Sequence, residues 1–139
     1  MSSVAVIVDT NVVVAGLLTA NPASAVARLL DAMLRAALPY AVSEALLAEY
    51  HAVLVRPRLR SLHGLTLAQI ETLLTTLARH AIVLQPVPGP AAPDPGDQLL
   101  WDLLAARPDL VLVTGDKPLL NAAGMRGRVL SPAAYLGGV

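Results

Sequence analysis

The chain contains no cysteine and no phenylalanine, and aromatic residues make up only 3% of its 139 residues. The absence of cysteine excludes disulfide frameworks and thiolate metal sites, so any bound metal must be held by oxygen or imidazole ligands. Because hydrophobic residues nevertheless reach 55%, the core must be built from Ala, Val and Leu. The formal net charge is zero. A strongly basic nucleic-acid-binding domain is therefore not indicated, and any basic surface must be local.

Long apolar runs are also absent. No run approaches the roughly 18 residues needed to span a bilayer, and the first residues lack the basic and apolar regions of a signal peptide. We therefore expect a cytoplasmic protein without membrane contacts. The length suits one compact domain over residues 1–139. The mean hydropathy of +0.62 predicts more apolar surface than one core can bury, which favours a partner such as a second copy in a homodimer.

The most informative stretch is Val4 to Asn11, in which small and β-branched apolar residues lead directly into Asp9-Thr10-Asn11. A continuous apolar run of this kind predicts a strand buried on both faces, with Asp9 where the strand ends. Ligands of open α/β sheets bind at the carboxyl ends of the strands. Asp9 is therefore a candidate site residue, although an Asp-Thr-Asn sequence is also ordinary turn chemistry.

Predicted strands and helices alternate along the chain. Apolar spacing, N-cap residues and proline breaks predict helices over 23–37 (started by Asn21-Pro22), 44–55, 67–79 and 97–106, with a short helix from Pro118. Strands are predicted over 4–8, 38–42, 81–85, 110–114 and 128–130. Arg58, Arg60 and His63 are placed in a loop, as is the proline-rich segment 86–96. This alternation predicts the α/β class, as a three-layer α/β/α sandwich with a central parallel sheet of about five strands.

Four acidic residues fall where this topology would bring them together. Asp9 and Asp116 each follow a strand that is expected to be central, and neighbouring strands lie only about 5 Å apart. Glu49 lies inside the helix after the second strand, and Asp97 begins the helix before the fourth. Four crowded carboxylates repel one another, and a hard divalent cation such as Mg²⁺ or Mn²⁺ resolves the repulsion. Such a site supports phosphodiester hydrolysis by a metal-activated water.

Each of these acids has a competitor or a structural alternative. Glu44 competes with Glu49, because a first-turn carboxylate suits the helix dipole without any function; the offset from the preceding serine favours Glu49. Asp94 competes with Asp97, which could itself be only an N-cap. Asp116 could cap the helix that follows it, but its place after a buried strand favours a role in a site.

The basic and aromatic residues carry weaker signals. Arg56, Arg58 and Arg60 form a local basic cluster, which is either a solvated face or a contact for an RNA backbone. Lys117 is either a solvated neighbour of the acids or a phosphate contact. Tyr50, like the single tryptophan, is interpreted as a packing residue within a helix.

These segments resemble the four motifs of the PIN-domain nucleases. The segments are Val8-Asp9-Thr10-Asn11-Val12, Ser43 followed by Glu49-Tyr50, Asp94-Pro95-Gly96-Asp97 and Val113-Thr114-Gly115-Asp116-Lys117. Their order and spacing are similar to the family pattern over nearly the whole chain. Within the family, the chain looks most like VapC-type toxins of bacterial type II toxin–antitoxin pairs, a likeness supported by the segment 43–59 with its ending Val53-Leu54-Val55-Arg56-Pro57.

The resemblance implies a five-stranded parallel sheet and an endoribonuclease that depends on Mg²⁺ or Mn²⁺. The acids implied as catalytic and metal-binding are Asp9, Glu49, Asp97 and Asp116. The residues implied to support them are Asn11, Thr114 and Ser43. RNA and a cognate antitoxin are the implied partners. One departure from the pattern is that Gly96 and Gln98 flank Asp97 where related chains often carry further acids, which leaves the number of metals open.

Two other functions fit parts of the pattern. A catalytically weak or inactive interaction module with the same fold would account for the zero net charge and the thin basic surface. A receiver-like phospho-acceptor domain also gathers acids at strand ends beside a Thr and a Lys. It requires an acceptor Asp after a central third strand, however, and the predicted strand 81–85 leads into Pro86-Val87-Pro88 without an acid.

Overall fold

The computed structural model describes residues 4–122 and 127–137, so the ends of the predicted 1–139 domain and residues 123–126 lie outside the described residues. The strands are β1 (Val6–Val8), β2 (Ala41–Val42), β3 (Ile82–Val83), β4 (Val111–Val113) and β5 (Val129–Leu130). The helices are α1 (Thr10–Leu18), α2 (Ala25–Leu34), α3 (Glu44–Leu54), α4 (Pro57–His63), α5 (Leu67–His80), α6 (Gln98–Leu104), α7 (Lys117–Leu120) and α8 (Pro132–Gly137), with a 3-10 turn η1 (Pro95–Asp97) before α6.

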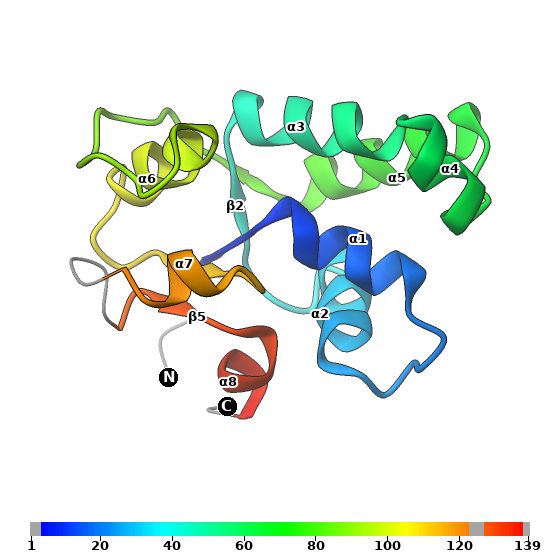
Figure 1. The fold of residues 1–139 in the computed structure, drawn as a ribbon, viewed down its shortest axis with the longest axis horizontal. Coiled ribbons are helices and arrows are strands. Elements are labelled where there is room, and N and C mark those ends of the chain that lie inside the picture. Colours follow the sequence, from blue (N-terminus) through cyan, green and yellow to red (C-terminus); the bar gives the residue numbers. More distant parts are fainter. Residues whose placement is uncertain (1–3, 123–126, 138–139) are drawn as a thin grey trace.

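A parallel sheet flanked by helices organises the fold (Figure 1), which confirms the predicted α/β/α class. The prediction of one sheet of about five strands is wrong in detail. The main sheet has three strands in the order β1-β4-β5, and β2 pairs with β3 in a separate two-stranded sheet. A single parallel bridge between Val6 and Tyr40 links β1 to β2. No further residue pair joins the two strands, so no continuous ladder forms between them.

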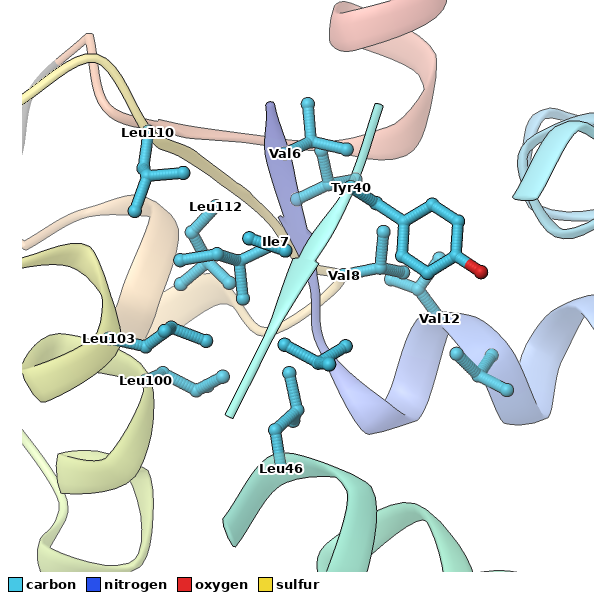
Figure 2. Packing of buried hydrophobic residues seen from close by; sticks show 14 of the residues in the cluster. Val6, Ile7, Val8, Val12, Tyr40, Leu46, Leu100, Leu103, Leu110 and Leu112 are labelled. Atoms are coloured by element: carbon cyan, nitrogen blue, oxygen red, sulfur yellow. The ribbon is translucent and has the colours of Figure 1, made fainter. Parts of the chain in front are cut away.

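The buried centre of the molecule is built around β1 and β4. All three residues of β1 are buried, and successive side chains of a strand point to opposite faces. Figure 2 shows Ile7 on the side of Leu100 and Leu103 of α6, whereas Val8 lies on the side of Val12 of α1. Leucine and valine make up most of the buried hydrophobic residues, as the composition predicts. The carboxyl end of β1 is therefore held from both faces.

Three helices, α1, α4 and α8, lie where the sequence predicted none. α1 begins immediately after Asp9. It packs closely on α2: at Gly16 the two helices are so near that an added Cβ would lie only 2.8 Å from the Val26 carbonyl oxygen. The prediction of a loop around Arg58, Arg60 and His63 is wrong, because this segment forms α4. Pro57 in its first turn suits a helix start. Gly64, at a φ of 69°, ends the helix in the left-handed region that favours glycine.

The helix predicted to start at Asn21-Pro22 begins later, at Ala25. The side chain of Asn21 accepts a hydrogen bond from the Ala23 N–H at 3.0 Å, which makes a local turn instead of a helix cap. Ser24 is the N-cap, and its hydroxyl accepts from the Ala27 N–H. A polar N-cap residue therefore starts this helix as predicted, but it is Ser24 and not Asn21.

Other helix starts agree with the sequence. The predicted capping box of Thr66 and Gln69 is confirmed, since each side chain accepts from the backbone N–H of the other. Ser43 is buried and accepts from the Leu46 N–H at 3.1 Å, which fixes the start of α3 and therefore the direction in which its later residues point. Within the described ranges, no helix is both long and apolar enough to cross a membrane.

Candidate active site

A pocket of about 520 Å³ opens where β1 and β4 end. Its polar wall carries all four acids that the sequence analysis selected, each from a different segment of the chain. Its remaining wall is mainly apolar and comes from α1, α3 and α4. The lining residues are Asp9, Thr10, Asn11, Val14, Ala15, Leu18, Glu49, Val53, Arg56, Leu59, Asp97 and Asp116.

Asp9 is fixed at the end of β1 by both its backbone and its side chain. Its N–H donates to the Val113 carbonyl at 2.9 Å, which extends the contact between β1 and β4. Its carboxylate accepts from the Thr114 hydroxyl at 2.7 Å. Only 6% of Asp9 is exposed. Burial raises the pKa of its carboxyl group, the Thr114 hydrogen bond opposes that rise, and the negative charge of Glu49 adds to it.

The loop after β4 is tied to the same point. The Thr114 hydroxyl that donates to Asp9 also accepts from the Asp116 N–H at 3.0 Å. One fully buried hydroxyl therefore sets the positions of both aspartates. The Asn11 side chain accepts from the Gly115 N–H at 3.3 Å, which joins the first turn of α1 to this loop.

Glu49 reaches the pocket from the middle of α3, and its carboxylate accepts from the hydroxyl of Thr10. The sequence analysis gave Thr10 no role. Its place between two motif residues was a signal, but no sequence rule shows where its hydroxyl points. The competing residue Glu44 is exposed and borders a smaller, separate pocket of about 240 Å³. Of the two glutamates on α3, only Glu49 therefore lies with the other acids.

The structure also separates Asp97 from Asp94. The Asp94 side chain accepts from the Gly96 N–H at 2.9 Å and caps η1, and it does not line the acidic pocket. The half-buried Asp97 does line it. Burial raises the pKa of Asp97 to about 6, and the negative charges of nearby acids, Asp9 foremost, contribute to the rise. Asp94 therefore has a structural partner, whereas Asp97 belongs to the acid cluster.

Three of the four acids share an unusual feature. Asp9, Asp97 and Asp116 occupy the N-cap positions of α1, α6 and α7, yet none of their side chains makes a capping hydrogen bond. An aspartate at an N-cap usually accepts from a backbone N–H of the first turn. These carboxylates are instead presented to the pocket. Capping, the structural alternative considered for Asp97 and Asp116, therefore does not account for them.

The basic residues are not placed together. Arg56, which is also exposed, lines the pocket together with Leu59 of α4. Arg58 and Arg60 are exposed on α4 and do not line the pocket. Lys117 is likewise exposed, at the start of α7. Arg56 is therefore the one member of the predicted basic cluster that lines the pocket with the acids.

The donor chemistry of the pocket fits a hard divalent cation. All four acidic side chains offer oxygen ligands, which Mg²⁺ and Mn²⁺ prefer. Burial, and after it the negative charge of neighbouring acids, raises the pKa of Asp9 and Asp97, and a bound cation would offset both effects. Among residues 4–122 and 127–137, no three His, Asp or Glu side chains already form a ligand set. The pocket therefore gathers suitable donors without holding them in a finished coordination sphere.

The comparisons with known proteins agree with this geometry. A family model described as PIN domain matches residues 5–118, a span that includes all four acids of the pocket. A search of the curated proteins finds no match.

Proposed function

The chain belongs to the PIN-domain family, whose members are generally nucleases that use divalent metals, and on this basis we propose that it is an endoribonuclease dependent on Mg²⁺ or Mn²⁺. The observation that carries the proposal is that Asp9, Asp97 and Asp116, none of which makes a capping hydrogen bond, line one pocket with Glu49. Capping does not account for Asp9 and Asp116, which leave α1 and α7 without a side-chain cap, or for Asp97, because Asp94 caps the turn that leads into α6.

In this proposal the four acids hold the cation and the rest of the pocket holds the RNA. A bound divalent cation supplies water activation and neutralises charge on the phosphate. Thr114 keeps one oxygen of Asp9 directed toward β4, and Thr10 keeps one oxygen of Glu49 directed toward α1. The apolar wall, which includes Val14 and Val53, would lie against one side of the bound RNA.

We also propose that the chain is the toxin of a toxin–antitoxin pair. The support is the likeness of the segment 43–59 to VapC-type proteins and the exposure of apolar residues such as Leu62, at 60%, and Leu67, at 51%. Exposed apolar surface favours a covering partner, either an antitoxin or a second copy of the chain. Sedimentation of the purified chain at several concentrations distinguishes these two partners. A homodimer would form without the antitoxin, whereas a chain that is covered only by the antitoxin would sediment as a monomer.

The function is tested by incubating the purified chain with a labelled single-stranded RNA and Mn²⁺. We expect internal cleavage that EDTA stops and that added Mn²⁺ restores. Expression of the chain without its antitoxin should then arrest bacterial growth. Binding of Mn²⁺ and of a protein partner without any RNA cleavage would instead support the non-catalytic interaction module.

Arg56 is expected to bind the RNA backbone. Because it lines the pocket, Arg56→Ala should raise the KM for RNA about tenfold, which corresponds to about 1.4 kcal/mol of binding, with little change in kcat. The slope of log affinity against log salt should fall by about 0.7, the value for one phosphate contact on a single strand. Steady-state kinetics at several salt concentrations measure both quantities.

Arg58→Ala is the matched control, because Arg58 lies two residues away on α4 but outside the pocket. Its KM should change less than about twofold, as expected for an exposed charge without a fixed contact. Equal effects of the two substitutions would show that the basic cluster acts only through its overall charge.

A further inference from the structure

The hydroxyl of Tyr50 is a buried polar group that the proposed function does not use. Tyr50 follows Glu49 on α3 and has no exposed surface. Its hydroxyl donates to the carbonyl oxygen of Val8, the last residue of β1.

The Val8 carbonyl needs such a donor because of the way the strands pair. Ala5 and Asp9 direct their backbone hydrogen bonds to β4, and Val6 directs its N–H to Pro39 on the opposite side. By the alternation of a parallel strand, Val8 also faces that opposite side. β1 and β2 share only the bridge at Val6 there, so β2 does not reach the Val8 carbonyl. The phenol of Tyr50 occupies the place that a neighbouring strand would otherwise take.

Two consecutive residues of α3 therefore hold the two neighbours of Asp9. Tyr50 donates to Val8, the residue before Asp9, and Glu49 accepts from Thr10, the residue after it. These two bonds bracket Asp9 and set the position of α3 against the end of β1. The separation of the Asp9 and Glu49 carboxylates depends on that position.

We propose that Tyr50 is a positioning residue that fixes α3 against the carboxyl end of β1 and so holds the Glu49 carboxylate in place, opposite Asp9, for cation binding. The part of this proposal that concerns the cation rests on the proposed function. The part that concerns the placement of α3 does not, and it can be tested in metal-free protein.

Tyr40 offers a closely matched control. Its side chain is 1% exposed, and its hydroxyl donates to the carbonyl oxygen of Leu77 on α5 at 2.6 Å. Neither Tyr40 nor Leu77 lines the acidic pocket. Tyr40→Phe therefore removes the same kind of bond, from a buried tyrosine to a backbone carbonyl, without touching the bracket around Asp9.

The experiment compares the wild type, Tyr50→Phe and Tyr40→Phe by calorimetric titration with Mn²⁺, by RNA cleavage and by thermal denaturation in EDTA. Both variants should lose similar thermal stability. Only Tyr50→Phe should weaken Mn²⁺ binding, by about tenfold or more, as is usual when a group that orients metal ligands is removed. Its kcat should fall at a fixed Mn²⁺ concentration, because less of the protein then holds the cation. Equal Mn²⁺ affinities of the two variants would overturn the proposal.

A metal-free measurement separates this proposal from the proposed function. In EDTA, hydrogen exchange of the α3 amides and of residues 8–11 should be faster in Tyr50→Phe than in Tyr40→Phe. Unchanged exchange would overturn the placement of α3 by Tyr50, whatever the metal does. If exchange is faster in Tyr50→Phe but the wild type neither binds Mn²⁺ nor cleaves RNA, the placement of α3 by Tyr50 is supported and the proposed function is rejected. Thr10→Val, which breaks the other half of the bracket, should combine with Tyr50→Phe non-additively in this assay.

Discussion

Asp9→Asn is expected to abolish RNA cleavage, lowering kcat/KM by about a thousandfold, which corresponds to about 4 kcal/mol of transition-state stabilisation. The substitution keeps the shape of the side chain and an oxygen that can accept from Thr114. It removes the negative charge and one of the two anionic oxygens that a hard cation requires. Initial rates with Mn²⁺ at saturating and subsaturating RNA measure the loss.

The variant should lose activity without losing stability. Because burial raises the pKa of Asp9, its charged form at neutral pH destabilises the folded state, and a neutral Asn relieves this cost. In EDTA at pH 7, Asp9→Asn should therefore melt at or above the temperature of the wild type. Asp31→Asn, at an exposed ion pair with Arg35, is the control and should leave cleavage unchanged. Activity of Asp9→Asn within about tenfold of the wild type, or 1.4 kcal/mol, would contradict the proposed mechanism.

Asp97→Asn is expected to have the second largest effect and to separate the two aspartates around η1. Asp97 lines the pocket and caps nothing, whereas Asp94 caps η1. Asp97→Asn should reduce kcat by about a hundredfold, or about 2.7 kcal/mol, through weaker cation binding. Asp94→Asn keeps a capping oxygen and should change kcat less than about threefold. Comparable losses of kcat in both variants would mean that the structure of η1, and not the carboxylate of Asp97 in the pocket, determines the activity.

The pH dependence of stability gives an independent test of Asp97. Its pKa is about 6 in the folded protein and 3.8 ordinarily, so between these values the folded state binds a proton that the unfolded state lacks. This contribution to stability is complete below the lower value and is lost as the pH rises through the higher one. In EDTA, Asp97→Asn should therefore melt above the wild type at pH 7, and the difference should shrink toward pH 4. Thermal denaturation of the wild type and of Asp97→Asn at these two pH values tests this expectation.

The same charges link stability to function in this pocket. Asp9 and Asp97 carry raised pKa values because their carboxyl groups are partly out of water and lie near other acids. Such crowding costs stability in the metal-free protein and is useful only where a cation compensates it. Saturation with a ligand that binds only the folded state adds about 2.7 kcal/mol at one hundred times its Kd. The wild type should consequently gain more thermal stability from Mn²⁺ than either variant does.

The sequence was sufficient to place the acids because their positions follow from rules about strands. A buried apolar run ends at Asp9 and another shortly before Asp116, and the edge at which parallel strands end is shared. The choices of Glu49 over Glu44 and of Asp97 over Asp94 agree with which residues line the pocket. The placement of Asp9 and Asp116 needs only topology, which hydrophobic patterning reveals, whereas Glu49 was chosen by its offset from Ser43.

The sequence was not sufficient where the outcome depends on side-chain direction or on the packing of distant segments. Tyr50 was interpreted as a packing residue, and its bond to Val8 arises only because β1 and β2 share a single bridge. The same lack of further pairing explains why the five strands do not form one ladder. α4 was missed because its basic, proline-started sequence resembles a loop. As a result, Arg56 could not be distinguished from Arg58 and Arg60, although only Arg56 lines the pocket.

The central claim is that the four acids form a site for a divalent cation, and anomalous diffraction from crystals grown with Mn²⁺ tests it most directly. The account predicts an anomalous difference peak inside the pocket, in contact with carboxylate oxygens of Asp9 and Asp116, that is absent from crystals of Asp9→Asn grown in the same way. Strong Mn²⁺ peaks elsewhere on the molecule with none among these carboxylates, in crystals whose pocket is open to solvent, would contradict it.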